Sequence, residues 1–356
     1  MSANWSLAID RADLSRTELR DEAPAALRDG EARLRVDRVG MTANNVTYAL
    51  LGDAMHYWDF FPTRPGWGLV PLWGFGEIVE STSAGVPVGA RVYGYFPSAS
   101  HLVVQPARID AGGFRDASEH RAVLPSPYNN YVFTTTDAAY VADQEDLLIL
   151  YRPLFFTSYM LADQLEDNAF FGATVIAMSS ASSKTAYGAA FLLQGQGPEI
   201  VALTSPGNVE FTESLGCYDR VLAYDAVSEL RSDAPTAYLD LAGSAELRTR
   251  LRAHLGDLLV HDAVVGVTHQ ERGATGDQRD ARTTFFFAPD QMRKRTGEWG
   301  RPVLDQRFAD AWLRFAPTVT GWVDVVAHAG PEELRDVWLE VLSGQSSPRV
   351  GHVVSL

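Results

Sequence analysis

Residues 179–185, with the sequence SSASSKT, carry the side chains of this chain that are best suited to hold a phosphate group. They lie between an apolar run, 173–180, and a segment with helical character, 184–194. Small residues keep such a turn tight, hydroxyls add donors to the backbone amides, and the N-terminus of a helix binds anions. The predicted cofactor-binding residues of this bend are Ser180, Ser182, Ser183, Lys184 and Thr185.

Lys184 stands where the helix is expected to begin. A cation there opposes the helix dipole at a cost of about 0.3–1 kcal/mol, and a bound phosphate would turn that cost into a gain. The alternative is an exposed lysine beside a solvated serine loop. The dinucleotide fingerprint places glycines in this turn, and this turn has none. It is not a Walker A loop either, because no glycine stands at the required spacing before Lys184.

The end of the next apolar run, 199–205, indicates which cofactor is preferred. NAD-binding folds commonly place an acid there to hold the ribose hydroxyls. This chain has Thr204, Ser205 and Asn208, and no acid before Glu210. A neutral polar pocket tolerates a 2′-phosphate, so NADP(H) is favoured over NAD(H). The alternative is an ordinary strand-to-helix turn capped by Ser205 or Asn208.

These candidate residues need a parallel sheet to position them. The pattern over 173–225 predicts strand, turn, helix, strand, helix and strand, which is half of a dinucleotide-binding sheet. Its helix over 184–194 has Ala186, Ala189, Ala190 and Leu193 on one face. Parallel strands bind nucleotides at their carboxyl ends, where the serine bend and Ser205 both stand.

Composition limits the classes of partner. The chain has 356 residues, 46% of them hydrophobic, and a formal net charge of −15, which disfavours nucleic acids and anionic membranes. No apolar run approaches the ~20 residues that span a bilayer. The lone cysteine, Cys217, excludes an internal disulfide and a cysteine-based structural zinc site. Without a basic-then-apolar signal region, we expect a soluble cytoplasmic protein that acts on a small-molecule substrate.

Residues 1–110 are expected to be β-rich, with strands over 31–42, 75–82, 89–97 and 101–109. Residues 111–150 are interpreted as a surface excursion, and 151–170 as a helix. Later segments are predicted as two strands at 237–243 and 262–269, helices at 244–257, 303–315 and 331–343, and a final strand at 350–356.

Together these elements resemble the medium-chain dehydrogenase/reductase superfamily, in its zinc-free quinone oxidoreductase-like and enoyl reductase-like branch. Residues 76–80 and 88–93 resemble the family's paired strand motifs "G-x-V-x" and "G-D-R-V", and 154–159 resembles its "L-T-A-Y" helix start. Residues 214–221 resemble "x-L-G-A-D-x-V", and the tail 342–354 resembles "L-x-S-G-x-x-x-G-K-V-V".

This resemblance implies an α/β fold with an N-terminal GroES-like β domain and a Rossmann domain with a doubly wound parallel sheet. The first domain would span residues 1–150, with the chain returning to it at about 320–356, and the Rossmann domain would span 151–319. It also implies a homodimer. Zinc is not expected, because Leu72 and Trp73 stand where zinc-binding members carry His and Glu, and residues 42–44 replace the first Cys.

The resemblance further implies where the nicotinamide and the substrate lie. The nicotinamide would lie beside Thr157, Gly266, Val267 and Phe286, with Tyr224 near the adenosine phosphate and the substrate between the domains. Catalytic candidates come from the first domain and are Asn45, Tyr48 and Tyr57. A tyrosine hydroxyl can donate to an enolate or alkoxide as it forms. The alternatives are a helix tyrosine packed on the barrel for Tyr48, a hydrophobic lid for Tyr57 and a core strand residue for Tyr224.

The predicted function is therefore a zinc-independent, NADPH-dependent oxidoreductase acting on a carbonyl compound or a carbonyl-conjugated alkene of quinone, enone or enoyl type. Two alternatives stay open. The chain could be an NADP-binding or protein-binding scaffold without redox turnover, or a lyase on the same fold with no net redox change.

Overall fold

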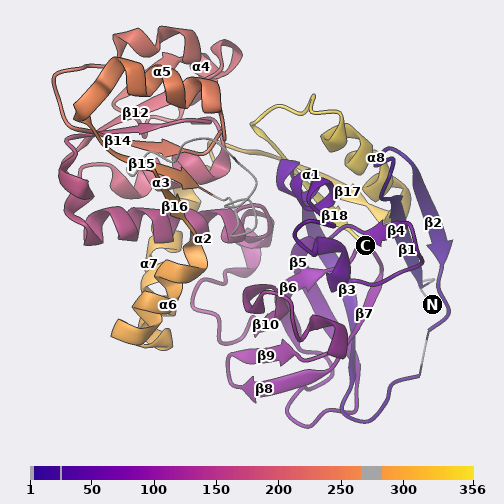
Figure 1. Cartoon of the computed structure of the whole chain (residues 1–356). Coiled ribbons are helices and arrows are strands. Elements are labelled where there is room, and N and C mark those ends of the chain that lie inside the picture. The colour runs from indigo at the N-terminus through magenta and orange to yellow at the C-terminus, as the bar shows by residue number, and fades with distance from the viewer. Residues whose placement is uncertain (1–3, 25, 266–282) are drawn as a thin grey trace. The chain divides into compact units, whose positions relative to one another are not determined.

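A computed structural model describes residues 4–24, 26–265 and 283–356, and the chain divides into two units (Figure 1). Unit 1 comprises residues 1–150 and 323–356, and unit 2 comprises residues 151–322. Unit 1 is built on two mainly antiparallel sheets, in which only β17 and β18 pair in parallel among the described strands, and unit 2 is built on a parallel sheet with helices. The fold class expected from the sequence is confirmed.

Unit 1 holds a nine-stranded sheet in the order β17-β18-β3-β5-β6-β10-β9-β8, with β7 paired to β3, and a three-stranded sheet in the order β2-β1-β4. The strands of the smaller sheet are β1 (Trp5–Asp10), β2 (Thr17–Asp21) and β4 (Trp67–Leu69). Those of the larger sheet are β3 (Ala32–Met41), β5 (Leu72–Ser81), β6 (Arg91–Phe96), β7 (His101–Val104), β8 (Pro106–Asp110), β9 (Gly113–Asp116), β10 (Asn130–Phe133), β17 (Asp324–Ala329) and β18 (Val350–Ser355).

The segment 111–150, interpreted from the sequence as a surface excursion, contributes two strands to this sheet. β10 pairs with β6 on one side and with β9 on the other. Tyr131 in β10 is fully buried, and its hydroxyl donates to the carbonyl of Tyr95 at 2.7 Å. The interpretation was wrong because four-residue strands flanked by turns carry almost no periodic signal, and pairing to a distant strand supplies their stability.

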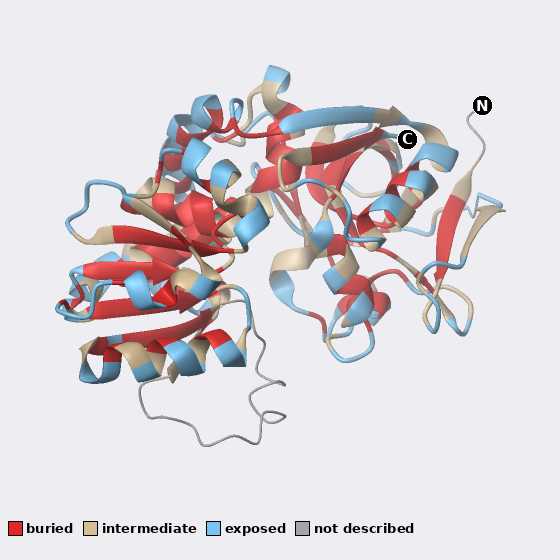
Figure 2. Cartoon of the chain, turned by 90° about the horizontal axis from the view of Figure 1, so that it is seen from above, coloured by how far each residue is buried: buried red, intermediate tan, exposed pale blue. Residues whose placement is uncertain are grey.

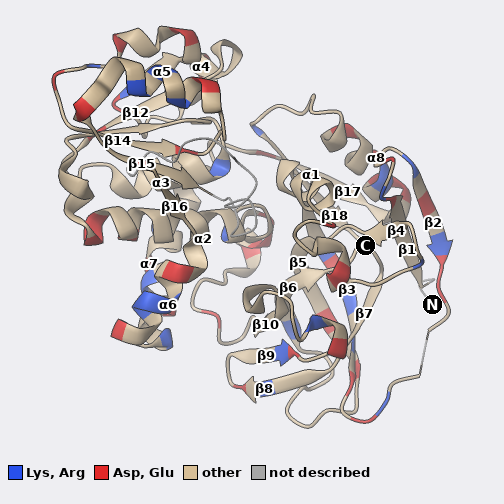
Figure 3. Ribbon diagram, in the orientation of Figure 1, with Lys and Arg blue, Asp and Glu red and all other residues tan. Residues whose placement is uncertain are grey.

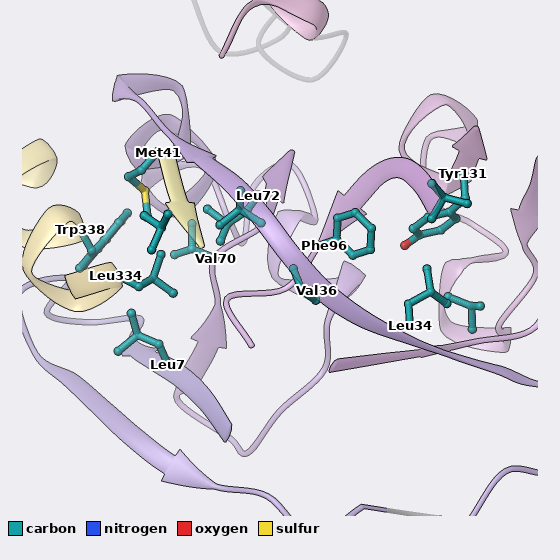
Figure 4. Close-up of a cluster of buried hydrophobic side chains, with 14 of the residues drawn as sticks. Leu7, Leu34, Val36, Met41, Val70, Leu72, Phe96, Tyr131, Leu334 and Trp338 are labelled. Atoms are coloured by element: carbon teal, nitrogen blue, oxygen red, sulfur yellow. The ribbon is translucent and has the colours of Figure 1, made fainter. Parts of the chain in front are cut away.

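The helix α8 (Gly330–Leu342) closes the core of unit 1. Its buried residues Leu334, Val337, Trp338 and Val341 recur at three- and four-residue spacing and form a single apolar face. Figure 4 shows Leu334 and Trp338 beside side chains from the sheets, including Leu7 and Met41, in one cluster. The C-terminal strand and helix therefore belong to the same core as residues near the N-terminus.

Unit 2 holds a six-stranded parallel sheet in the order β13-β12-β11-β14-β15-β16. Its strands are β11 (Val175–Met178), β12 (Glu199–Thr204), β13 (Arg220–Ala223), β14 (Thr236–Asp240), β15 (Leu259–Val265) and β16 (Thr283–Phe286). In chain order this is 3-2-1-4-5-6, the order of the Rossmann fold. The direction of strand addition reverses between β11 and β14, so the topological switch point lies at their carboxyl ends.

The remaining helices are α1 (Ala43–Leu50) in unit 1, α2 (Glu145–Asp167), which begins in unit 1 and continues into unit 2, and five in unit 2: α3 (Lys184–Leu193), α4 (Val209–Ser214), α5 (Ala245–Leu255), α6 (Ala288–Trp299) and α7 (Arg301–Val319). Short 3-10 helices are η1 (Tyr57–Phe60), η2 (Glu119–Arg121), η3 (Ser126–Asn129), η4 (Ala142–Gln144), η5 (Ala169–Gly172), η6 (Pro206–Asn208), η7 (Tyr224–Glu229) and η8 (Gly256–Leu258).

Small residues let α3 pack tightly in unit 2. The predicted inner face, Ala186, Ala189, Ala190 and Leu193, is fully buried, and Figure 2 shows that much of the parallel sheet is buried as well. A Cβ added at Gly188 would lie 2.7 Å from the Ser158 hydroxyl of α2. This close approach fixes the direction of α3, and with it the position of its N-terminus at the end of β11.

Candidate functional site

The switch point of unit 2 is braced by a buried serine and a buried aspartate. Ser179, just after β11, donates from its hydroxyl to Asp240 Oδ1 at 3.0 Å, and Asp240 ends β14. The Ser179 hydroxyl oxygen also accepts from the amides of Leu241 and Ala242, both at 3.0 Å. Arg248 of α5 contacts Asp240 Oδ2 at 2.5 Å. The two central strands are therefore locked together where a nucleotide would approach.

A left-handed serine makes the turn that glycine makes in the dinucleotide fingerprint. Ser180 has φ +51°, and its amide donates to the Tyr224 hydroxyl at 3.0 Å. The next amide, of Ala181, donates to the Leu203 carbonyl at 3.2 Å. The bend is thus tied to the ends of β12 and β13, and a tight turn forms without glycine.

Two further predicted residues meet at the start of α3. The Asn208 side-chain amide donates to the Ser182 hydroxyl at 3.2 Å. Ser183 is the N-cap, and its hydroxyl accepts from the amide of Ala186 at 3.3 Å. The structure therefore brings Ser180, Ser182, Asn208 and Tyr224 together, although they follow three different strands. The first-turn amides of α3 point out of the helix end, as at any helix N-terminus.

Lys184 is the first residue of α3, as the sequence predicted. Its side chain is half-buried, and its ammonium lies 5.7 Å from the centre of the Tyr151 ring. Desolvation lowers the pKa of Lys184 to about 8. An anion bound beside this ammonium would oppose both the desolvation and the helix dipole.

The other predicted cofactor-binding residues of unit 2 lie at several different places in the fold. Thr204 is buried at the end of β12, and Ser205 precedes η6 with a partly exposed side chain. The Thr185 carbonyl accepts from Ser158, and the Thr157 hydroxyl donates within α2 to the Pro153 carbonyl at 3.2 Å. Phe286 is buried at the end of β16. Gly266 and Val267 lie outside the residues that the structure describes.

In unit 1, the side chain of Asn45 stabilises the N-terminus of α1 through its hydrogen bonds. Its Oδ1 accepts from the Thr42 amide at 2.8 Å, and its Nδ2 donates to the Pro71 carbonyl at 2.8 Å. This is the third helical position of a capping box. The same cap sets the direction of α1 and so positions Tyr48 on its buried face.

The Tyr48 hydroxyl oxygen accepts two hydrogen bonds in the interior of unit 1. The donors are Asn44 Nδ2 at 2.7 Å and Trp73 Nε1 at 3.3 Å. A phenol oxygen that accepts twice uses its own proton as a donor in another direction. Burial, and then the nearby Tyr128, raise the pKa of Tyr48 far above its ordinary value, so the hydroxyl keeps its proton.

Tyr57, the second tyrosine candidate, lies in the same group of rings. Its ring centre is 4.5 Å from that of Tyr48 and 6.0 Å from that of Tyr128. Burial and then Tyr48 raise the pKa of Tyr57 to about 12. Tyr95 contacts both Tyr48 and Trp73 in this group. The rings pack against one another, tilted or edge to face, in a buried cluster that also contains hydroxyl groups.

Sequence reasoning missed the charged network behind the switch point. Arg248 and Arg252 of α5 hold Asp262 of β15 at 3.2 and 2.7 Å, and Arg248 also holds Asp240. Both carboxylates are fully buried. The only sequence signal was the spacing of Arg248 and Arg252, which puts both on one helix face. That spacing is also typical of a solvated surface.

Ser180→Gly is expected to raise the free energy of unfolding by about 0.5–1 kcal/mol. A left-handed L-residue costs about 1–2 kcal/mol, whereas glycine avoids that cost and loses about 0.5–1 kcal/mol more in backbone entropy. Urea denaturation of both proteins measures the difference. The control is Ser205→Gly, where φ is −69° and ψ is 150°, and that change is expected to destabilise. A less stable Ser180→Gly protein would contradict the strain at this position.

Within the described residues, no group of three or more His, Cys, Asp or Glu side chains is arranged to hold a metal ion. None of the helices that the structure describes combines the length and the apolar character needed to cross a bilayer.

A family model described as "Protein of unknown function (DUF2855)" matches residues 39–347. A search of curated protein sequences found no match. Among solved structures, CurA from Vibrio vulnificus in complex with NADPH is 11% identical, with a TM-score of 0.62 over 95% of this chain and 94% of that chain. The quinone oxidoreductase from Coxiella burnetii is 13% identical, with a TM-score of 0.56 over the full length of both chains. CurK enoyl reductase is 14% identical, with a TM-score of 0.55 over 99% of each chain.

These likenesses show the fold, because they cover nearly the whole chain at low identity. It is the two-domain fold of the medium-chain dehydrogenase/reductase superfamily, and two of these neighbours are a quinone oxidoreductase and an enoyl reductase. The fold that the sequence motifs implied by resemblance is confirmed.

Proposed function

The chain belongs to the family described as "Protein of unknown function (DUF2855)", and we propose that it is an NADP(H)-dependent oxidoreductase. Its substrate would be a carbonyl compound or a carbonyl-conjugated alkene of quinone, enone or enoyl type. The reaction would need no zinc. A homodimer and a cytoplasmic location remain predictions of the same proposal.

The observation that carries the proposal is the group of hydrogen-bond donors that gathers at the N-terminus of α3, beside the switch point. The donor set there fits a diphosphate: first-turn amides other than that of Ala186, which donates to Ser183, the Ser182 and Ser183 hydroxyls, and the ammonium of Lys184. Ser180 shows that the missing glycines do not prevent the tight turn, because it adopts their conformation itself. The residues present therefore fit the group that the Rossmann order implies.

Two observations support NADP(H) over NAD(H). The end of β12 and η6 offer Thr204, Ser205 and Asn208, and no carboxylate that would repel a 2′-phosphate. One structural neighbour, CurA, is titled as a complex with NADPH. When bound, this cofactor supplies a hydride to an electron-poor carbon.

The chain's own contribution to the chemistry would be made by Tyr48. Its hydroxyl keeps its proton, and it stabilises by hydrogen bonding the oxyanion that develops when a conjugated carbonyl is reduced. Asn45 would act indirectly, by fixing the helix that carries Tyr48.

A titration with NADPH across pH tests the nucleotide site through Lys184. Between pH 7.5 and 9.5 the phosphates keep their charge, because their last ionisation lies near pH 6. The pKa of Lys184 is about 8 without nucleotide, and an anion raises it, so binding above pH 8 takes up a proton. The dissociation constant is therefore expected to rise with pH, by up to about tenfold per pH unit. Quenching of tryptophan fluorescence measures it.

Lys184→Arg and Lys184→Met are matched variants for this titration. Arginine keeps its charge throughout this range, so the affinity of the Lys184→Arg variant for NADPH should not change with pH. Lys184→Met should weaken binding about 10- to 100-fold at pH 7.5, the effect of losing a charged hydrogen bond. If the native protein shows no pH dependence, or if neither nicotinamide nucleotide binds, the proposed site is wrong.

The same lowered pKa has a consequence for the protein without nucleotide. Below pH 8 the charged form of Lys184 lowers the free energy of unfolding of the protein without nucleotide. This destabilisation disappears as the pH rises toward the ordinary lysine pKa of about 10.4.

One observation favours a second candidate, a nucleotide-binding protein without redox turnover. Donors of the bend are already used inside the protein, since Ser180 donates to Tyr224 and Ala181 to Leu203. Binding of NADPH with no oxidation in the presence of any member of a quinone and enone panel would establish this alternative.

A further inference from the structure

A cavity of about 350 Å³ lies in unit 2 at the end of α3 remote from the nucleotide site. Its lining comes from α2, α6 and α7, from Leu192 near the end of α3 and from Gln196 just after it. Leu192 follows Lys184 by eight residues, which is about 12 Å along a helix at 1.5 Å per residue. The volume suits one small ligand, since such pockets hold about 300–1,000 Å³.

One wall of the cavity is a braced aromatic ring. Trp299 lies between two guanidinium groups, 4.4 Å from that of Arg295 and 4.2 Å from that of Arg307. Arg295 is held in turn by Asp163 at 2.7 Å and Asp167 at 3.0 Å. Because the ring is fixed in this way, it holds Arg307 in place before any ligand arrives, and little conformational entropy would be lost when Arg307 binds one.

Four charged groups, of both signs, line the same cavity and form no ion pair with the residues that the structure describes, although Asp310 Oδ1 accepts from Gln306 Nε2 at 2.9 Å. Arg307, Asp310 and Arg314 stand on one face of α7, and Glu166 comes from α2. Figure 3 shows that α6 and α7 carry residues of both signs. Asp310 and Arg314 have the i,i+4 spacing that usually pairs, as Arg301 and Asp305 do on the same helix at 2.7 Å. Yet none of these four cavity groups lies within 4.0 Å of an opposite charge among the residues that the structure describes.

The acidic side of the cavity favours a cation. Desolvation, and then the neighbouring Asp163, raise the pKa of Glu166. An incoming ammonium group would oppose both effects. On the basic side, Arg314 and Arg307 present planar N–H donors that match a carboxylate. Arg307 can stay stacked on Trp299 while the N–H edge of its guanidinium group donates to a carboxylate.

We propose that this cavity binds a small zwitterion that carries an apolar or aromatic group, the chemistry of a free amino acid. The carboxylate would contact Arg307 and Arg314, and the ammonium would contact Glu166 and Asp310. The side group would pack on Leu192 and Tyr159, which also line the cavity. The site is separate from the nucleotide site, and the inference does not depend on the proposed function.

Three ligands of one size test this assignment on the full-length protein. L-Phenylalanine carries both charges, phenylacetate carries only the carboxylate, and phenethylamine carries only the ammonium. At millimolar concentration, L-phenylalanine is expected to raise the Tm by about 2–4 °C, and each single-charge analogue by less than half of that. Equal shifts with all three ligands, or no shift with L-phenylalanine, would overturn the proposal.

Variants of exposed residues complete the test without threatening the fold. Arg314→Gln and Glu166→Gln should each abolish the shift with L-phenylalanine, whereas Arg301→Gln, on the same helix but outside the cavity, should retain it. NADPH affinity measured in parallel should not change in Glu166→Gln. A shift that survives in both cavity variants would mean that the amino acid binds elsewhere.

Discussion

Replacing Tyr48 with phenylalanine is expected to lower kcat about 10²- to 10³-fold, the usual effect of removing one oxyanion donor. The hydroxyl oxygen already accepts from Asn44 and Trp73, so its proton is directed elsewhere as a donor. Because burial raises the pKa of Tyr48 far above its usual range, that proton is present at any working pH. Steady-state kinetics with NADPH and a panel of quinones and enones measures the loss. KM should change much less than kcat, since the interaction forms mainly in the transition state.

Tyr57→Phe is the matched control, because it removes a hydroxyl from the same aromatic group. Its expected effect on kcat is a few-fold at most. NADPH affinity of Tyr48→Phe should equal that of the native protein, since the serine bend belongs to the other unit. If both variants lose activity equally, packing of the rings rather than a hydroxyl donor is responsible. If Tyr48→Phe retains full kcat, Tyr48 is not the donor.

Asp240→Ala is expected to lower the free energy of unfolding of unit 2 by about 3–5 kcal/mol, as for other broken buried charge pairs. The carboxylate accepts from the Ser179 hydroxyl, from the Gly243 amide at 2.9 Å and from Arg248. Its loss leaves buried donors unsatisfied at the junction of β11 and β14. Urea denaturation followed by circular dichroism measures the change. NADPH binding should weaken as well, because Ser179 begins the bend.

Asp233→Ala provides the comparison for this variant. Asp233 pairs with Arg231 at 2.8 Å, but its side chain is 75% exposed, and solvent screens the pair. Its denaturation midpoint should match that of the native protein. An equal loss of stability in both variants would show that the buried network contributes no more to the free energy of unfolding than an exposed ion pair.

The parallel sheet was predictable because each of its inner strands is a short apolar run followed by a turn. The helix over 184–194 and the strand over 199–205 were predicted almost to the residue. Their order along the chain imposes the position of the serine bend, since a right-handed crossover leaves few alternatives. Lys184 was correctly placed at the first turn of a helix because the helical pattern begins at that residue, directly after the turn.

Other features depend on contacts between segments far apart in the sequence. β9 and β10 are strands because β6 pairs with β10, and neither has a pattern of its own. The segment 101–109, predicted as one strand, forms β7 and β8, which pair with β3 and β9 respectively. Proline at 106 lacks the amide that a continuous ladder would need.

By itself, the sequence determined the parallel α/β half, its strand order along the chain, and the small hydroxyl bend with a lysine at the start of a helix. These features depend on local periodicity and on turn-forming residues, and both are set by residues that lie close together in the sequence. Only the tertiary structure decided that Ser180 would take the left-handed conformation, that Tyr224 and Asn208 would reach the bend, and that Asp240 would lie beneath it. Those outcomes depend on buried hydrogen bonds between strand ends, and their partners are 26 to 61 residues apart in the chain.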